Sequence, residues 1–207
     1  SRFSKQPKWV VGFSDITVLH SHIHTNCEVA SLHASMPIVF ETNTETAIES
    51  LRKTLFGESL SYEVAAHHLN REGEASAEII GGNLSLIYSL IGSKSDIDTK
   101  GKILLLEDLD EYLYHIDRMM MNLKRSGKLK RLAGLLVGGM SDMNDNTIAF
   151  GQTAYEIIAA HTKEYDYPIS FQFPVGHWPD NRAVYLGKKA NLQVKKDKVC
   201  LSYIEMV

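Results

Sequence analysis

Apolar runs of strand length alternate with amphipathic segments along most of the chain. Runs of about four to eight apolar residues bounded by glycine, proline or charged residues are typical of buried strands, whereas apolar positions that recur every three or four residues indicate helices. The predicted strands span residues 8–13, 28–36, 102–108, 132–140 and the first part of 167–177. The predicted helices span residues 15–26, 44–56, 83–92, 111–128 and 147–165.

Helix start and stop signals support three of these segments. Residues 111–128 begin with acidic residues, end with basic ones and contain Gly127 as a stop, which makes them the clearest helix. Residues 44–56 are followed by Gly57, and Asn83 is a candidate N-cap for the next predicted helix.

Two regions show alternation rather than helical periodicity. Residues 59–69 and 72–80 alternate enough to predict a pair of adjacent strands, and roughly the last thirty residues predict a small antiparallel meander. Strands that alternate with helices, followed by a β-rich end, predict a mixed α/β fold.

The composition is that of an ordinary folded protein and excludes several classes of partner. The chain has 207 residues, of which 44% are hydrophobic, so it can bury a full core. Its formal net charge of −3 offers no basic excess for nucleic acid or for an anionic membrane surface. No apolar run approaches the roughly 20 residues of a membrane span. Cys27 and Cys200 have neither metal-binding nor redox spacing, so we expect both to stay reduced.

A serine lies where the first strand is predicted to meet the first helix. Residues 10–17 read VVGFSDIT, so Ser14 follows an apolar run and precedes a helix start. Two interpretations stay open: Ser14 caps the helix, or it is a nucleophile held on a tight strand-to-helix turn. Ile16 stands where the G-x-S-x-G motif has its second glycine, which disfavours an ordinary α/β-hydrolase.

A serine nucleophile needs a base and an acid that orients the base. Glu107 ends the apolar run 103–106, and carboxyl ends of parallel strands face the crevice where α/β active sites form; a solvated strand end is the alternative. His177 lies beside Gly176 in a loop after a predicted strand, and a surface position is its alternative. Ser14, Glu107 and His177 follow the chain order of α/β-hydrolases, which is weak support by itself.

The histidines His20, His22 and His24 raise the question of a metal site. On a helix only His20 and His24 share a face, and no further ligand motif accompanies them. We therefore expect a solvated helix face, no metal and no cofactor. Gly81 and Gly82 lack the lysine and the spacing of a phosphate loop, so we expect a tight turn or a structural role near the site.

Several stretches together resemble the LD-carboxypeptidases, a family of serine peptidases that includes muramoyltetrapeptide carboxypeptidase and the microcin C self-immunity protein. These stretches follow the order and spacing of that family. They are GFSDIT, IIGGNLSLIYSLIG, GKILLLEDLDEYLYHIDRMMMNLKRSG, AGLLVGG and FPVGH. Each stretch is weak alone, but the combination is specific and covers nearly the whole chain.

The resemblance implies roles for particular residues. By matching motif, Ser14 is the nucleophile, Glu107 is the acid that orients the base, and His177 is the general base. The backbone N–H of Asp15 is implied as an oxyanion donor, and Asn83 is expected to take part in oxyanion or substrate binding. No metal is required by this set.

The resemblance also implies a domain organisation. Members of the family have a flavodoxin-like N-terminal domain with an Arg-Gly-Gly-Tyr-Gly stretch, which this sequence lacks. We therefore expect residues 1–57 to be a remnant of that parallel-sheet domain and residues 58–207 to form a swivelling β/β/α C-terminal domain. On this interpretation the chain is the C-terminal part of a longer protein and is inactive in isolation. Residues from 1 to about 40 are then expected to be poorly packed or covered by another copy.

The implied reaction is hydrolysis of the L,D-peptide bond that releases a C-terminal D-alanine from murein tetrapeptides, with a muropeptide as substrate and a cytoplasmic homodimer as the setting. Three alternatives stay open. The chain is a microcin-immunity-type peptidase that cleaves an aminoacyl-nucleotide conjugate, or an inactive fragment of such an enzyme, or an unrelated α/β binding domain. The last would place Ser14, Glu107 and His177 far apart.

Overall fold

Two β-sheets form the framework of the computed structural model, which describes residues 2–203. The smaller sheet has the strand order β1–β2–β8, and the larger has the order β3–β10–β9–β4–β5–β6–β7. The strands of the smaller sheet are β1 (Val11–Gly12), β2 (Ser31–His33) and β8 (Val184–Leu186). Those of the larger sheet are β3 (Ser61–Ala65), β4 (Gly73–Asn83), β5 (Ile103–Leu109), β6 (Gly134–Ser141), β7 (Ile169–Ser170), β9 (Lys189–Val194) and β10 (Lys198–Tyr203).

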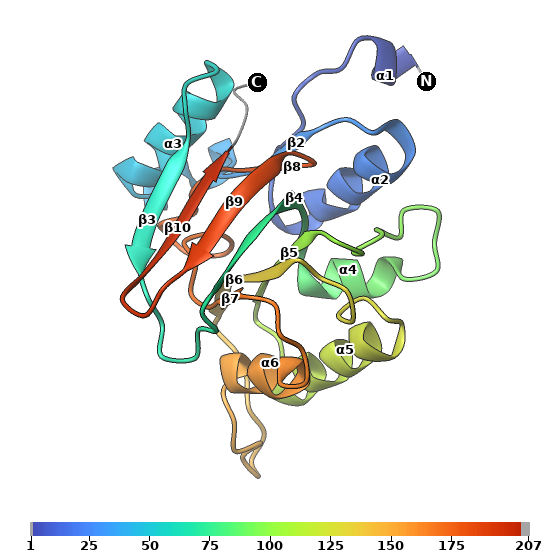
Figure 1. Ribbon diagram of the computed structural model, residues 1–207, viewed down its shortest axis with the longest axis vertical. Coiled ribbons are helices and arrows are strands. Elements are labelled where there is room, and N and C mark those ends of the chain that lie inside the picture. The colour runs from blue at the N-terminus through green and yellow to red at the C-terminus, as the bar shows by residue number, and fades with distance from the viewer. Residues whose placement is uncertain (1, 204–207) are drawn as a thin grey trace.

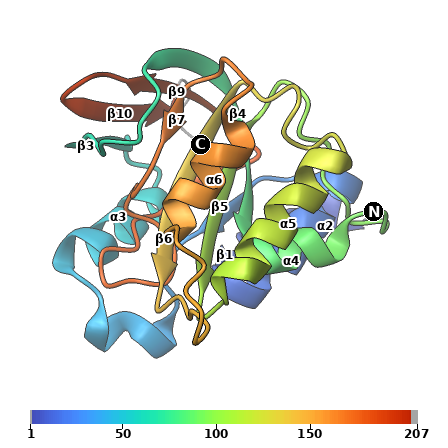
Figure 2. The ribbon, with the colours of Figure 1, turned by 90° about the horizontal axis from the view of Figure 1, so that it is seen from below.

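Helices cover the parallel part of the larger sheet. Strands β4, β5, β6 and β7 run parallel, and helices α4, α5 and α6 lie along one side of them in both views (Figures 1 and 2). Helix α2 packs against α4 and β4, while α3 lies on the other side of the molecule. The helices are α1 (Arg2–Lys5), α2 (Thr17–Cys27), α3 (Glu45–Leu55), α4 (Leu84–Leu90), α5 (Leu113–Arg125) and α6 (Ala154–Thr162), with 3₁₀ turns η1 (Ser14–Ile16) and η2 (Pro37–Thr42).

Strand β5 separates two hydrophobic cores. Side chains alternate across a strand, so Leu104 and Leu106 point into a core shared with α4, α5 and α6. Ile103 and Leu105 point the other way, into a core that contains Leu32 of the smaller sheet and residues of β9 and β10. Because both faces are covered, this strand reads as a continuous apolar run in the sequence.

The mixed α/β prediction is confirmed, but several elements differ from the prediction. Strands β3 and β4, predicted to be adjacent, are separated by β10 and β9, and β8 leaves the C-terminal meander to pair with β2. The helix predicted over 147–165 begins only at Ala154, because Thr153 and Glu156 form a capping box there. No helix among residues 2–203 has the length and apolar character needed to cross a membrane.

The start of the chain is packed more tightly than predicted. Leu32, His33 and Ala34 have no exposed surface, since β2 lies between β1 and β8 and against the larger sheet. The prediction of poor packing before residue 40 is therefore wrong for β2.

Candidate active site

A buried acid and a histidine meet at the carboxyl end of β5. Glu107 continues the face of Ile103 and Leu105 and has no exposed surface. His177 lies in the loop after β7, and its Nδ1 is 2.6 Å from Oε2 of Glu107. With Nδ1–H donating to the carboxylate, Nε2 is left as the proton acceptor of the ring.

The pKa values of the two groups are set by burial and by one another. Burial favours the neutral acid of Glu107, but His177 and His33, which approach its two oxygens, hold the pKa of this carboxyl below its usual range. Burial also disfavours the His177 imidazolium, but the hydrogen bond and charge of Glu107 outweigh it and raise the pKa of His177. Asp108 and Asp15 act in the same direction as Glu107. The pair is therefore arranged as a carboxylate that stabilises a protonated imidazole.

The absence of side chains at two glycines makes room for Glu107. A Cβ on Gly176, which has a φ of +100°, would lie 2.7 Å from both Cβ and Oε2 of Glu107. A Cβ on Gly138 would lie 3.2 Å from Cβ of the same residue. Glycine at these positions is required for the carboxylate and the His177 loop to approach so closely.

Ser14 lies on a sharp turn between β1 and α2. Its φ of +58° is the left-handed conformation, which a non-glycine residue rarely adopts and which marks strained turns at functional sites. A Cβ on Gly12 would lie 2.6 Å from the Ile16 side chain, so the turn leaves room only for glycine at position 12. Ser14 is half-buried, and neither η1 nor α2 has a side-chain cap hydrogen bond. The helix-cap interpretation of Ser14 is therefore wrong.

Both sequence neighbours of Ser14 interact with His177. The Phe13 ring lies edge-on against the His177 ring, with 4.8 Å between the centroids, and the charge of Asp15 acts on His177. Within residues 2–203 the hydrogen bond of the His177 ring goes to Glu107, and none joins the ring to Ser14. The Asp15 side chain is exposed, while its backbone N–H directly follows Ser14 in the turn.

Asn83 is held by structural hydrogen bonds. Its Oδ1 accepts from the backbone N–H of Leu86 at 3.2 Å and so caps α4, and its Nδ2 donates to Oδ1 of Asp108 at 2.9 Å. Burial raises the pKa of Asp108 to about 6, although Ser85 also donates to this carboxylate. The predicted N-cap is confirmed, and a role of Asn83 in oxyanion or substrate binding stays a prediction.

The glycine pair and the histidine series have structural explanations. Gly81 and Gly82 lie inside β4 rather than in a turn, and a Cβ on Gly82 would collide with Thr17 of α2. The predicted tight turn is therefore wrong: Gly82 lets α2 pack onto the sheet, and Gly81 leaves room for the backbone of Leu105 in β5. His20 is buried rather than solvated, because its Nε2 bonds to the carbonyl of Gly12 at 2.9 Å. Residues 2–203 contain no cluster of three or more metal-ligating side chains.

A buried histidine that sequence reasoning missed also approaches Glu107. His33 ends β2 with no exposed surface, and its Nε2 lies 3.6 Å from Oε1 of Glu107. The available signal was a histidine in a short strand of otherwise small and apolar residues, but nothing in the sequence connects that strand to β5.

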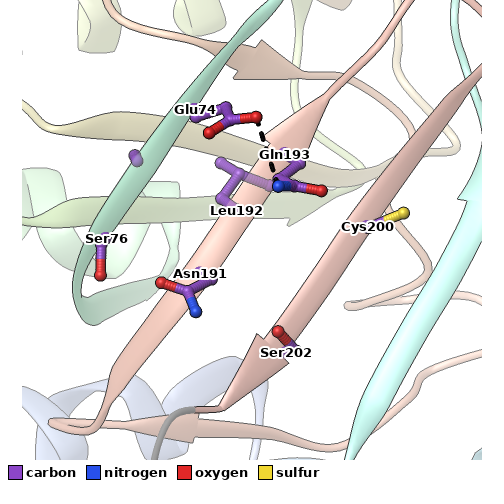
Figure 3. A pocket seen from close by; sticks show the side chains of 8 residues that line it. Glu74, Ser76, Asn191, Leu192, Gln193, Cys200 and Ser202 are labelled. Atoms are coloured by element: carbon purple, nitrogen blue, oxygen red, sulfur yellow. Dashed lines mark hydrogen bonds between the residues drawn. The ribbon is translucent and has the colours of Figure 1, made fainter.

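A separate hollow lies on the outer face of the antiparallel strands (Figure 3). It has a volume of about 500 Å³ and is lined from β4, β9 and β10 by residues that include Ser76, Asn191 and Cys200. Glu74 and Gln193 are joined across it by a hydrogen bond of 3.3 Å. Its lining contains no histidine that could form an acid–base pair with the Glu74 carboxylate, so we do not place the chemistry there.

Known proteins resemble this chain in sequence and in fold. Residues 76–192 match the LD-carboxypeptidase C-terminal domain, and residues 1–34 match the LD-carboxypeptidase N-terminal domain. The chain is 34% identical over 204 residues to the probable murein peptide carboxypeptidase of Bacillus subtilis (strain 168), with 92% of this chain and 61% of that protein covered. It is 26% identical over 199 residues to the murein tetrapeptide carboxypeptidase of Pseudomonas aeruginosa, with 90% of this chain and 63% of that protein covered.

The chain thus spans about three fifths of the length of these relatives. The crystal structure of muramoyltetrapeptide carboxypeptidase from Oxalobacter formigenes has the same fold, with a TM-score of 0.89 at 23% identity. That likeness covers 99% of this chain and 71% of the other.

Proposed function

Because the chain belongs to the LD-carboxypeptidase family, we propose that it supplies the catalytic groups of a serine carboxypeptidase that releases a C-terminal D-alanine from murein tetrapeptides. The names of the relatives from Bacillus subtilis and Pseudomonas aeruginosa support a murein peptide as the substrate class. The family prediction made from the motifs is confirmed.

One observation carries the proposal. The Glu107–His177 hydrogen bond of 2.6 Å is buried near the carboxyl end of a parallel strand, and Phe13, which directly precedes Ser14, packs its ring against the same histidine. An acid, a base oriented by it and a serine on a sharp turn are the three parts of a serine hydrolase site.

The proposed reaction assigns one step to each group. Nε2 of His177 takes the proton of Ser14 as Oγ attacks the carbonyl of the peptide bond before D-alanine. Glu107 stabilises the imidazolium, and the backbone N–H of Asp15 donates to the oxyanion. His177 then protonates the leaving amine, and water hydrolyses the acyl-enzyme by the reverse sequence.

We also propose that residues 1–57 belong to the N-terminal domain and residues 58–207 to the C-terminal domain. The matched segments 1–34 and 76–192 lie on the two sides of that boundary and support it. A reaction that uses these side chains alone needs no metal, so a chelator is expected to leave it unchanged. The homodimer and the cytoplasmic setting stay predictions.

The test is release of D-alanine from a purified muramoyl tetrapeptide. We expect release by the protein translated from the complete reading frame, with loss of nearly all turnover in Ser14→Ala and His177→Ala. A tetrapeptide ending in L-alanine is the matched control and is expected to stay intact. Full release by the Ser14→Ala variant would contradict the proposed nucleophile. The 207-residue chain, assayed in parallel, tests the expectation that it is inactive alone.

A further inference from the structure

Only one of the two carboxylate oxygens of Glu107 meets His177. Oε2 bonds to Nδ1 of that histidine, whereas Oε1 makes no hydrogen bond within residues 2–203. Glu107 has no exposed surface, so bulk water does not reach the second oxygen. An ionised carboxylate with an unpartnered oxygen is unfavourable in such a place, which makes the group facing Oε1 important.

That group is a second buried histidine. Nε2 of His33 lies 3.6 Å from Oε1 of Glu107, and both ring nitrogens of His33 also lack a hydrogen bond in the described part of the chain. Two unpartnered and fully buried polar groups therefore face one another. A contraction of about half an ångström would bring the two atoms to hydrogen-bond distance.

His33 reaches Glu107 from the other sheet. It pairs with Gly12 of β1 in the parallel register, two residues before Ser14. The Phe13 ring lies against both imidazoles, with centroids 6.2 Å from His33 and 4.8 Å from His177. His33 therefore connects the strand that leads to the serine with the strand that carries the acid.

We propose that His33 is a positioning residue, whose Nε2–H donates to Oε1 of Glu107 and so limits the negative charge that this carboxylate presents to His177. The inference rests on the proposed function, in which His177 is the general base. His33 acts through Glu107 and does not touch the substrate.

The charges around the pair determine the effect of removing this donor. Besides Glu107, the titratable groups that act on His177 are Asp108 and Asp15, and His20 is the group on which the charge of His33 acts. Without a donor on Oε1, more negative charge faces His177, and protonation of the carboxylate itself also becomes easier. The Glu107–His177 pair therefore binds a proton more tightly, whichever of the two groups carries it. The higher of the two pKa values of the pair rises as a result.

The experiment is an NMR titration of the ring nitrogens in the ¹⁵N-labelled chain. We expect His33→Phe, which removes the donor, to raise the pKa measured at His177 by about 0.5–1 pH unit, the size expected for one hydrogen bond. His33→Gln retains an N–H donor and should restore most of the wild-type value. His161→Phe is the matched control, since His161 is also buried and bonds to a carboxylate, Asp117, at 2.7 Å. It should not change the pKa of His177.

An unchanged pKa of His177 in folded His33→Phe would overturn the proposal. If that variant does not fold, the tautomer of His33 in the wild-type chain decides: a proton on Nε2 supports the proposal, and a proton on Nδ1 alone contradicts it. These readouts do not depend on turnover. If the wild-type protein from the complete reading frame releases no D-alanine while His33→Phe shifts the pKa of His177, only the proposed function is rejected. If the wild type releases D-alanine and the pKa is unshifted, only the role of His33 is rejected.

Discussion

The backbone conformation of Ser14 is energetically unfavourable, and its proposed role as a nucleophile explains why the chain adopts it. A left-handed φ of +58° at a residue with a Cβ is unfavourable by about 1–2 kcal/mol, and a serine cap would not require it. The sequence identified the position of Ser14 in a strand-to-helix turn, but not its backbone conformation. That conformation depends on how closely Gly12 and Ile16 approach in the folded turn.

We predict that the two substitutions Ser14→Gly and Ser14→Ala differ in stability although both abolish activity. Ser14→Gly should be more stable to urea than Ser14→Ala by about 0.5–1 kcal/mol, because only glycine relieves the left-handed strain. Both variants should lose D-alanine release. Glu28, at φ +55° after α2, is the matched control: Glu28→Gly should gain similar stability over Glu28→Ala while activity is retained. Equal stabilities of the two Ser14 variants would contradict the strained turn.

We predict an activity profile that falls at acid pH. The general base must be neutral, and Glu107 raises the pKa of His177 above its ordinary value of 6.5. The midpoint of the acid limb of kcat/KM should therefore lie above pH 6.5, and Glu107→Gln should move it to lower pH as well as slow the reaction. A wild-type midpoint at or below pH 6.5 would show that the pair is not coupled in this way.

At the scale of elements, the local sequence pattern predicted where helices and buried strands lie better than it predicted which strands pair with one another. The helix over 111–128 corresponds to α5, because its caps and its apolar face are local signals. The pairing of β8 with β2 joins segments about 150 residues apart and leaves no periodic signal in either. The start of α6 at Ala154 was missed because the capping box at Thr153 and Glu156 lies inside the predicted segment.

The burial of His20 in α2 predicts that the stability of the protein depends on pH. Burial lowers the pKa of His20 to about 4, whereas the unfolded chain has a value near 6.5. Between these values the unfolded state binds more protons, so the free energy of unfolding rises with pH, by up to about 3 kcal/mol at 1.36 kcal/mol per pH unit.

His20→Gln retains a donor for the Gly12 carbonyl but does not titrate. Its free energy of unfolding, measured in urea from pH 4 to pH 6.5, should rise less steeply than that of the wild type. His22→Gln, at an exposed position on the same helix, is the control and should keep the wild-type slope. Parallel curves for His20→Gln and the wild type would contradict the buried, neutral state of His20.

At the scale of the whole molecule, the candidate site lies where the two sheets meet. Ser14 follows β1 of the smaller sheet, and Glu107 lies near the carboxyl end of β5 of the larger one. Chain order and motif resemblance identified Ser14, Glu107 and His177, because each follows or ends a predicted strand. They gave no indication of His33, since its role depends on the packing of one sheet against the other.

We predict that a side chain at position 176, next to Glu107 where the two sheets meet, disrupts both the site and the fold. A Cβ there would press on Glu107 at 2.7 Å, so Gly176→Ala should lower turnover at least about 100-fold and destabilise the fold by more than about 2 kcal/mol. Gly151→Ala is the matched control, with φ +83° and open space around the added Cβ. It should cost about 1 kcal/mol of stability and leave turnover unchanged. Similar losses in the two variants would show that the close approach to Glu107 is unimportant.

Covalent labelling of Ser14 tests the central claim most directly. A fluorophosphonate reacts with a serine only when a neighbouring base activates the hydroxyl, and the modified residue is identified by peptide mass spectrometry. We predict one adduct, on Ser14, that forms in the wild-type protein from the complete reading frame and is lost in His177→Ala. Release of D-alanine by protein in which Ser14 stays unlabelled, or labelling that persists at the wild-type rate in His177→Ala, would contradict the account.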